Sequence, residues 1–228
     1  MKLRNPFSDL TMFERFLWLG SVAAIAGSAL LFGETDILSV IASLIGVTSL
    51  IFLAKGYVLG QALIIVFGLI YGYISFRCRY YGEMITYVGM TAPVAAATLI
   101  EWLRHPYAGT REVEVAPLTP RKLRLVILLT AAVTAAFYWI LSALNTANLP
   151  LSTFSVTTSF FAASLTYLRS PWYALGYAAN DVVLIGLWVF ASRNDPSSLP
   201  MVVCFVVFLI NDLYGFFSWR AMQRRQST

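Results

Sequence analysis

The chain has 228 residues, of which 59% are hydrophobic and 12% charged, and its formal net charge is +5. A soluble domain is about 45–50% apolar and roughly 25% charged, so an ordinary soluble protein is excluded and a polytopic integral membrane protein is predicted. In such proteins Lys and Arg chiefly report topology, so the positive charge does not indicate nucleic-acid binding. Two cysteines, Cys78 and Cys204, with the single His105, cannot build a typical structural zinc site, and we expect no metal or cofactor.

Eight runs of mostly apolar residues are each long enough to cross a bilayer as a helix, which needs about 17–25 residues. Most are separated by short turns rich in Gly, Pro, Asn or charged residues. The predicted fold class is therefore an all-α membrane protein. The predicted spans are Phe16–Phe32, Ile37–Ala54, Val58–Phe76, Glu83–Leu103, Leu123–Leu144, Leu151–Leu168, Trp172–Phe190 and Leu199–Trp219.

Basic residues favour one side of the membrane. With eight spans both ends lie on the same side, which would hold thirteen of the sixteen Lys and Arg residues, against Arg77, Arg79 and Arg193 on the other. This positive-inside bias predicts that both termini are cytoplasmic.

The two halves of the chain resemble each other. Trp102 and Trp219 end the last span of each half, 117 positions apart, and the basic turns at Lys55 and Arg169 lie 114 apart. Each half would be a leading helix followed by a three-helix bundle. An even number of spans per half predicts parallel repeats about a pseudo-twofold axis, with a substrate site between them. The predicted parts are an interfacial amino terminus 1–15, a first membrane half 16–103, a cytoplasmic linker 104–122, a second half 123–219 and a basic cytoplasmic tail 220–228.

The stretch from Trp172 to Trp188 is apolar enough to span a membrane, yet it carries Asn180 and Asp181 near its middle. A carboxylate at a helix centre costs about 2.5–3.5 kcal/mol or more, so it normally faces a bundle interior or a water-filled cavity. We expect a wall of a small-molecule site here, and the alternative is a structural polar pair that caps a helix or bridges protomers. Helical spacing places the following residues on that one face: Tyr173, Tyr177, Asn180, Asp181, Leu184 and Trp188.

Other spans supply further candidates. Asn211 and Asp212 form a second polar pair in the last span. This pair would close the site from the other side, and the alternative for Asp212 is an ion pair with a basic turn such as Arg169. Gln61 would contribute a hydrogen bond from the first half, and a structural role is equally consistent with its position. Tyr87 would contribute a ring contact.

Two glutamates at span ends, Glu83 and Glu101, lie close to arginines in the sequence, so we expect structural pairing at the membrane interface. The chain contains no HExxH, GxSxG or P-loop motif. It is therefore not expected to be an enzyme.

The segment LIFLAKGYVLGQALIIVFGLIYGYISFRCRYYGEMITYVGM, with its LAKG turn and YYGE re-entry, resembles the PnuC transporters. The segment LRSPWYALGYAANDVVLIGLWVF is similar to that family's aromatic helix with a following Asn. The resemblance extends from Ile37 to Trp219. One feature departs from it. The family has two tryptophans three residues apart, followed four residues later by Asn. If Asn180 is that Asn, Tyr173 and Gly176 stand in place of the tryptophans, and if Asp181 takes its position, Tyr177 replaces the second tryptophan.

The resemblance implies a multi-pass protein of the bacterial inner membrane with a SWEET-like fold of two three-helix bundles, assembled as a homotrimer. It implies facilitated diffusion of nicotinamide riboside for NAD biosynthesis, with trapping by intracellular phosphorylation. Asn180 and Asp181 would bind the ribose hydroxyls, with Asp181 attracting the cationic ring. Because no Lys or Arg lies within a span core, a phosphate would lack a partner and the mononucleotide should be rejected. Thiamine, riboflavin or a deoxynucleoside remain alternative substrates, and a non-transporting receptor or scaffold is the alternative class.

Overall fold

The structure is a computed structural model that describes residues 5–31, 37–77, 81–146, 148–193 and 199–227. Apart from turns and two isolated β-bridges, these residues form helices, and each predicted span corresponds to a helix or, for the fourth span, to three consecutive helical pieces. The elements are η1 (Pro6–Asp9), α1 (Met12–Leu31), α2 (Ile37–Ala54), α3 (Val58–Arg77), α4 (Tyr81–Thr86), the π-helix η2 (Tyr87–Thr91), α5 (Ala92–Arg104), α6 (Pro120–Ala143), α7 (Leu149–Tyr167), α8 (Tyr173–Ser192) and α9 (Leu199–Gln226).

Within the described ranges, seven segments are long and apolar enough to cross a membrane, and α7 falls outside this set. Of its 19 residues, eight are Ser or Thr. Several of these hydroxyls bond within the helix: Thr157 donates to the Thr153 carbonyl at 2.8 Å, and Thr166 to the Ala162 carbonyl at 2.9 Å. A helix that satisfies its polar groups internally fits the apolar part of a bilayer, and α7 lies between α5, α6 and α8.

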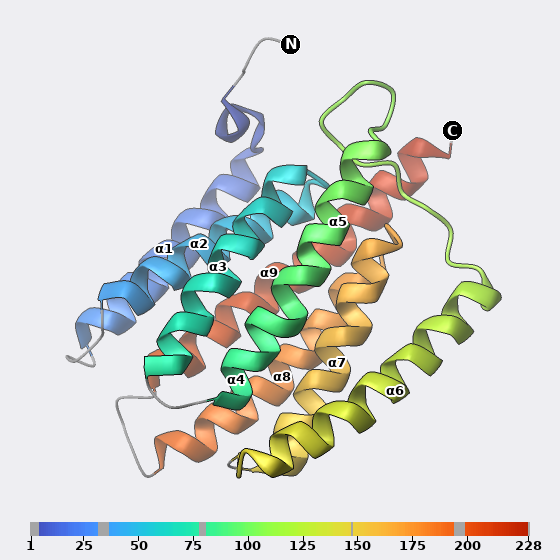
Figure 1. Ribbon diagram of the computed structural model, residues 1–228. Helices are drawn as coiled ribbons and strands as arrows, with labels where there is room; N and C mark the ends of the chain where they lie inside the picture. Colours follow the sequence, from blue (N-terminus) through green and yellow to red (C-terminus); the bar gives the residue numbers. More distant parts are fainter. Residues whose placement is uncertain (1–4, 32–36, 78–80, 147, 194–198, 228) are drawn as a thin grey trace.

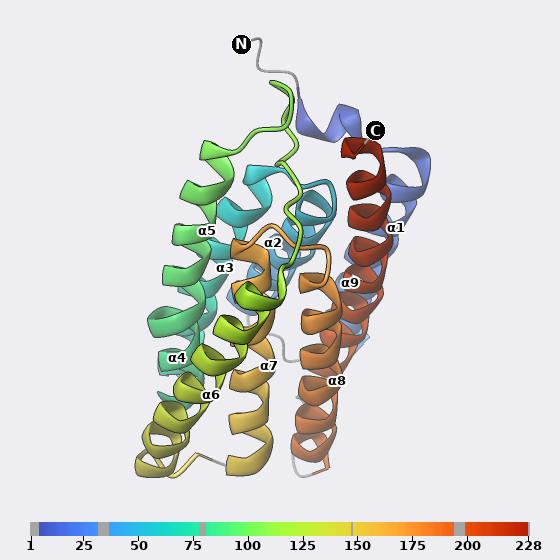
Figure 2. The ribbon, with the colours of Figure 1, turned by 90° about the vertical axis from the view of Figure 1, so that its right-hand side faces the viewer.

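The helices of the two halves have matching neighbours. In the first half α2 packs on α3 and α3 on α5, and in the second half α7 packs on α8 and α8 on α9. Across the halves α2 contacts α9, and α7 contacts α5. The leading helices α1 and α6 flank this bundle on opposite sides (Figure 1). Both termini and the loop between α5 and α6 lie at the same end of the molecule (Figures 1 and 2).

Equivalent turns end α2 and α7. The amide of Gly56 donates to the Leu53 carbonyl at 2.8 Å, and the amide of Arg169 donates to the Thr166 carbonyl at 3.0 Å. A second hydrogen bond, which joins residues five positions apart, closes each turn. In it the Tyr57 amide donates to the Phe52 carbonyl, and the Ser170 amide donates to the Leu165 carbonyl. Gly56 and Arg169 both have positive φ, 66° and 56°. These are the features of a Schellman cap, which satisfies the last carbonyls of a helix.

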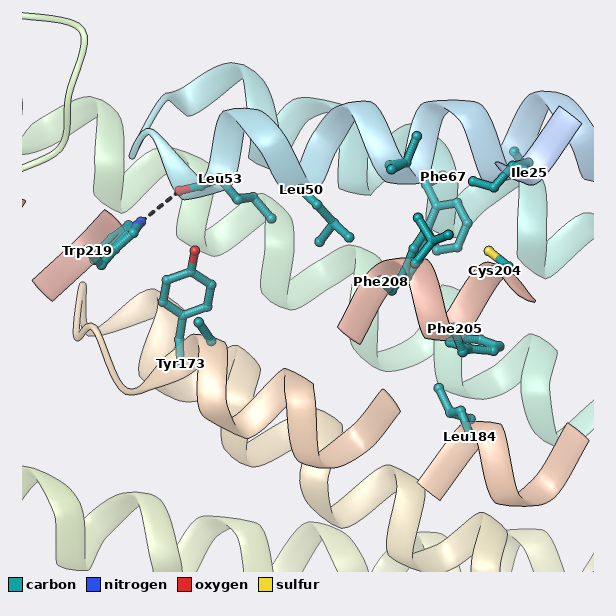
Figure 3. Close-up of a cluster of buried hydrophobic side chains, with 14 of the residues drawn as sticks. Ile25, Leu50, Leu53, Phe67, Tyr173, Leu184, Cys204, Phe205, Phe208 and Trp219 are labelled. Carbon is teal, nitrogen blue, oxygen red and sulfur yellow. Dashed lines mark hydrogen bonds between the residues drawn. The ribbon is translucent and has the colours of Figure 1, made fainter. Parts of the chain in front are cut away.

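A buried indole from the other half completes each cap. The Trp219 Nε1 of α9 donates to the Leu53 carbonyl at 2.7 Å, drawn as the dashed line in Figure 3. The Trp102 Nε1 of α5 donates to the Thr166 carbonyl at 3.1 Å. Both side chains are fully buried, and their ring centroids lie 5.4 Å apart. The two tryptophans that the sequence pairs by position thus meet at the centre of the bundle and link its halves.

The linker between the halves bonds to both caps. The Val113 amide donates to the Gly56 carbonyl at 2.9 Å, and the Ala116 amide donates to the Arg169 carbonyl at 3.0 Å. The Arg169 side chain lies 3.7 Å from the Glu101 carboxylate and 3.6 Å from that of Glu114. Glu101 therefore has the structural pairing expected of it, with Arg169 as a partner.

A polar network attaches helix α1 to the outer side of the bundle. The Glu14 carboxylate is buried and lies 3.2 Å from Lys55 Nζ, and it accepts a hydrogen bond of 2.9 Å from the Tyr214 hydroxyl. Nearby, burial and the Asp9 and Glu112 carboxylates raise the pKa of Tyr57 to about 12, which keeps its hydroxyl neutral. These contacts position the amino-terminal segment against the α2–α3 turn.

Replacing Trp219 with Phe removes the indole N–H from the Leu53 carbonyl. Loss of a buried hydrogen bond with part of the ring volume should lower the free energy of unfolding by about 1–3 kcal/mol. Trp102→Phe should act in the same way. Thermal unfolding of the purified protein in detergent measures the effect, with Trp139→Phe as control because Trp139 is 72% exposed. Equal unfolding temperatures for Trp219→Phe and Trp139→Phe would contradict this role of the indole.

Candidate functional site

A cavity of about 110 Å³ lies between the two halves. Side chains from α2, α3, α4, η2, α7, α8 and α9 line it, with two residues from the end of α6 and the turn after it. The lining residues are Leu50, Leu53, Ile64, Phe67, Gly82, Glu83, Thr86, Tyr87, Thr91, Leu141, Thr146, Ser152, Ser155, Val156, Ser159, Ala163, Tyr177, Asn180, Asp181, Leu184, Leu187, Phe205, Phe208 and Asp212.

Helix α8 supplies a polar wall of this cavity. Tyr177, Asn180, Asp181 and Leu184 line it, as their shared helical face predicts. Asn180 is 6% exposed and Asp181 is 4% exposed. Both residues thus lie at membrane depth and face an internal space rather than lipid.

Neighbouring hydroxyl groups orient the Asn180 side chain. Its Oδ1 accepts hydrogen bonds from Ser155 Oγ at 3.1 Å and from Thr158 Oγ1 at 2.9 Å, both on α7. With the oxygen occupied in this way, the amide nitrogen is the group that Asn180 offers as a donor. The many hydroxyls of α7 therefore fix the position and orientation of a polar group in the cavity.

The two members of the second polar pair point in different directions. Asp212 lines the cavity, whereas Asn211 donates to Ser21 Oγ on α1 at 2.9 Å and to the Val207 carbonyl at 2.8 Å. Adjacent residues on a helix are about 100° apart, so only one of them faces a given neighbour. Asn211 attaches α9 to α1. Asp212 interacts directly with the Asp181 carboxyl group, and the nearest cationic turn, at Arg169, pairs with Glu101 instead.

Of the other predicted site residues, Tyr87 lines the cavity, and Gln61, Tyr173 and Trp188 do not. Gln61 is buried within α3. Tyr173 lies one turn before Tyr177 and packs edge-on against Trp219, with ring centroids 4.9 Å apart. Trp188 packs against the edge of the core. Tyr173 therefore belongs to the junction between the halves rather than to the cavity wall (Figure 3).

Glu83 also lines the cavity, although the sequence suggested interfacial pairing for it. Among the residues that the structure describes it forms no ion pair, and Arg79 lies outside them. Its short helix α4 leads into the π-helix η2, from which Tyr87 and Thr91 reach the cavity. Single π-turns within helices frequently occur at functional sites. The π-helix and the contacts between the α7 hydroxyl groups and Asn180 are the parts of the site that the sequence did not predict.

An aromatic wall faces the polar one. Phe67 of α3 contacts Tyr87 edge-on, with centroids 5.9 Å apart, and Phe208 of α9 at 6.2 Å. Phe208 also contacts Phe205 at 5.8 Å. Figure 3 shows Phe67 and Phe208 side by side above Phe205. The rings in the lining come from α3, η2 and α9 as well as from Tyr177 of α8, whereas the sequence predicted ring contacts on α8 and at Tyr87.

The lining is electrostatically one-sided. Three carboxyl-bearing residues, Glu83, Asp181 and Asp212, contribute to it, and none of the described lining residues is Lys, Arg or His. Aromatic rings and hydroxyl groups account for much of the remaining surface. A site that is formed between two helical bundles, within the predicted spans, and that has apolar, hydroxyl and acidic walls is typical of small-molecule membrane transporters.

The comparisons with known proteins agree with this class. Residues 36–221 match the family model described as nicotinamide mononucleotide transporter, so the chain belongs to that family, which consists of transporters and not enzymes. A nicotinamide riboside transporter PnuC of Neisseria mucosa is 28% identical over 98% of this chain and 87% of its own length. The crystal structure of the vitamin B3 transporter PnuC superposes with a TM-score of 0.83 at 25% identity, covering 96% of this chain and 95% of that one. The expected PnuC resemblance and the all-α membrane fold are confirmed.

Gly46 of α2 controls the aromatic wall without lining the cavity. A Cβ at this position would lie 2.7 Å from the Phe208 ring and 3.3 Å from that of Phe67. Gly46→Ala should displace these rings and lower ligand affinity about tenfold, because overpacking forces side chains from their positions. Binding by isothermal titration measures this, with Gly27→Ala as control since a Cβ there meets nothing within 4 Å. Unchanged affinity in Gly46→Ala would show that ligand does not contact these rings.

Proposed function

We propose that this protein carries nicotinamide riboside across the bacterial inner membrane. The observation that carries the proposal is the cavity between the halves, in which an aromatic wall faces a wall of hydroxyl, amide and carboxyl groups. Nicotinamide riboside has the same division, with a flat cationic ring joined to a sugar that bears hydroxyl groups. The names of the Neisseria mucosa relative and of the solved vitamin B3 transporter support this substrate.

In this arrangement the ring would stack on Phe67, Tyr87 and Phe208, and the ribose would lie toward Asn180. A cation above an aromatic face gains about 0.5–2 kcal/mol for each contact. The Asn180 amide, oriented by Ser155 and Thr158, would donate to a ribose hydroxyl. This places the two chemical parts of the ligand on the two walls that suit them.

The riboside fits this lining better than the mononucleotide in the family's description. A phosphate dianion requires cationic or N–H donors, and burying it beside carboxylates carries a large electrostatic cost. Glu83, Asp181 and Asp212 line the cavity, and the other described residues around it include no Lys or Arg. The substrate is therefore taken to be the unphosphorylated nucleoside.

Transport would proceed by facilitated diffusion. At about 110 Å³ the cavity is smaller than the roughly 300–1,000 Å³ typical of small-molecule sites. A nucleoside can enter only when the walls move apart, and the two halves, interpreted as parallel SWEET-like repeats, are the bodies that would move. Intracellular phosphorylation would trap the product for NAD biosynthesis and maintain the gradient.

The orientation and assembly follow from sequence bias and family membership. The linker and the caps at Gly56 and Arg169 lie together, at the end that also holds both termini (Figure 1). Since these segments carry most of the Lys and Arg residues, we place this end in the cytoplasm. We also propose a homotrimer from the family resemblance, which the mass of the detergent-solubilised protein tests by light scattering.

Uptake of labelled nicotinamide riboside into proteoliposomes tests the proposed function. The parent protein should equilibrate the riboside without an ion gradient. Asn180→Ala should lower the initial rate at least about tenfold, because it removes the oriented amide and leaves two hydroxyls without their acceptor. Asn5→Ala, which removes an amide from the amino-terminal segment, should have no effect. A folded parent that transports thiamine or a deoxynucleoside but not the riboside would refute the substrate, and an unaffected Asn180→Ala would refute the site.

The mononucleotide provides a separate test of the charge argument. It should compete with labelled riboside at least about tenfold less well than unlabelled riboside does, because its phosphate meets only carboxylates and hydroxyls in the cavity. Competition by the two compounds is measured in the same proteoliposomes. Equal inhibition would contradict the exclusion of phosphate.

A further inference from the structure

Two carboxyl groups meet in the wall of the cavity. Asp181 of α8 and Asp212 of α9 are 4% and 5% exposed, and their side chains interact directly. They come from different helices, and each lines the cavity. The packing of α8 against α9 therefore brings these two residues together, although they are distant in the sequence.

The pair is incompletely satisfied by the protein. Asp181 Oδ2 is buried and has no hydrogen-bond partner among the described residues. The described residues that line the cavity include no Lys, Arg or His, so none of them balances the charge of the carboxyl groups. Two buried carboxyl groups in contact do not both stay ionised, so they share one proton and keep one negative charge. A cation from outside the chain can balance that charge.

The surroundings of the pair indicate the chemistry of that partner. Phe208 lies four residues before Asp212 on α9, so the two share a helix face, and both line the cavity. Phe67 lies against Phe208. An aromatic face beside an acidic pair suits a flat organic cation, which gains ring stacking and charge attraction together. A neutral ring of the same shape would gain only the stacking.

We propose that Asp181 and Asp212 act as a shared counter-ion that selects the charge of the substrate ring. This inference rests on the proposed function and adds a specificity determinant to it. The oxidised riboside carries a pyridinium cation, and the reduced riboside carries a neutral dihydropyridine of nearly the same size. The site should therefore bind the oxidised form and discriminate against the reduced form through charge and not through shape.

Competition binding with the two forms of the riboside tests this proposal. Each form displaces labelled oxidised riboside from the intact protein in detergent, under anaerobic conditions so that the reduced form persists. The parent should bind the oxidised form at least about tenfold more tightly. In the double variant Asp181→Asn/Asp212→Asn, which conserves shape and removes the shared charge, the preference should fall to about threefold or less. Glu114→Gln, which removes a carboxylate that is 59% exposed in the linker, should retain the full preference.

The possible results separate this inference from the proposed function. Equal affinity of the parent for the two forms would overturn charge selection and leave riboside transport standing. A preference that persists in the double Asn variant would assign the discrimination to groups other than the pair. Failure of the folded parent to bind either form would refute the proposed substrate and this inference with it. The parent measurement decides the question even where a variant unfolds.

Discussion

The structure depends on how its two halves are joined in a solvent that offers no hydrogen bonds. Inside a bilayer the last carbonyls of a helix must find donors within the protein. Here α2 and α7 end in matching caps, and the indole N–H of a tryptophan from the opposite half donates to each one. Trp102 and Trp219 also touch each other, so one reciprocal contact joins the two halves at the end of the bundle where the linker bonds to the caps. The cavity lies further along the same helices, where those constraints end.

The matching neighbours of the halves contrast with an unequal distribution of chemistry. The first half contributes mostly apolar and aromatic lining, such as Leu50, Leu53 and Phe67, together with Glu83. Most hydroxyls and the interacting Asp181 and Asp212 carboxyl groups come from the second half. Similar backbones can therefore form a pocket with two different sides, which an asymmetric ligand requires.

The helices were predictable from sequence because bilayer thickness imposes a length and apolar character on every span. The α8 face was predictable for a related reason, since a polar pair such as Asn180 and Asp181 has few acceptable positions in a membrane. The direction in which a given side chain points from its helix was harder to predict. Asn211 and Asp212 are neighbours, and only contacts with α1 and α8 decide which of them reaches the cavity. Glu83 was assigned to the interface because its sequence neighbours are basic, whereas the turn into η2 places it in the cavity lining.

The linker limits how the halves can separate. Val113 and Ala116 are three residues apart, and they bond to the caps of α2 and α7 respectively. A fully extended chain of three residues spans about 10 Å, so these two helix ends remain neighbours as long as both bonds persist. If the halves separate while both bonds persist, this end acts as a pivot and the bundle opens most at its far end. Opening at the linker end requires at least one of these two bonds to break, so the linker holds that end of the bundle together.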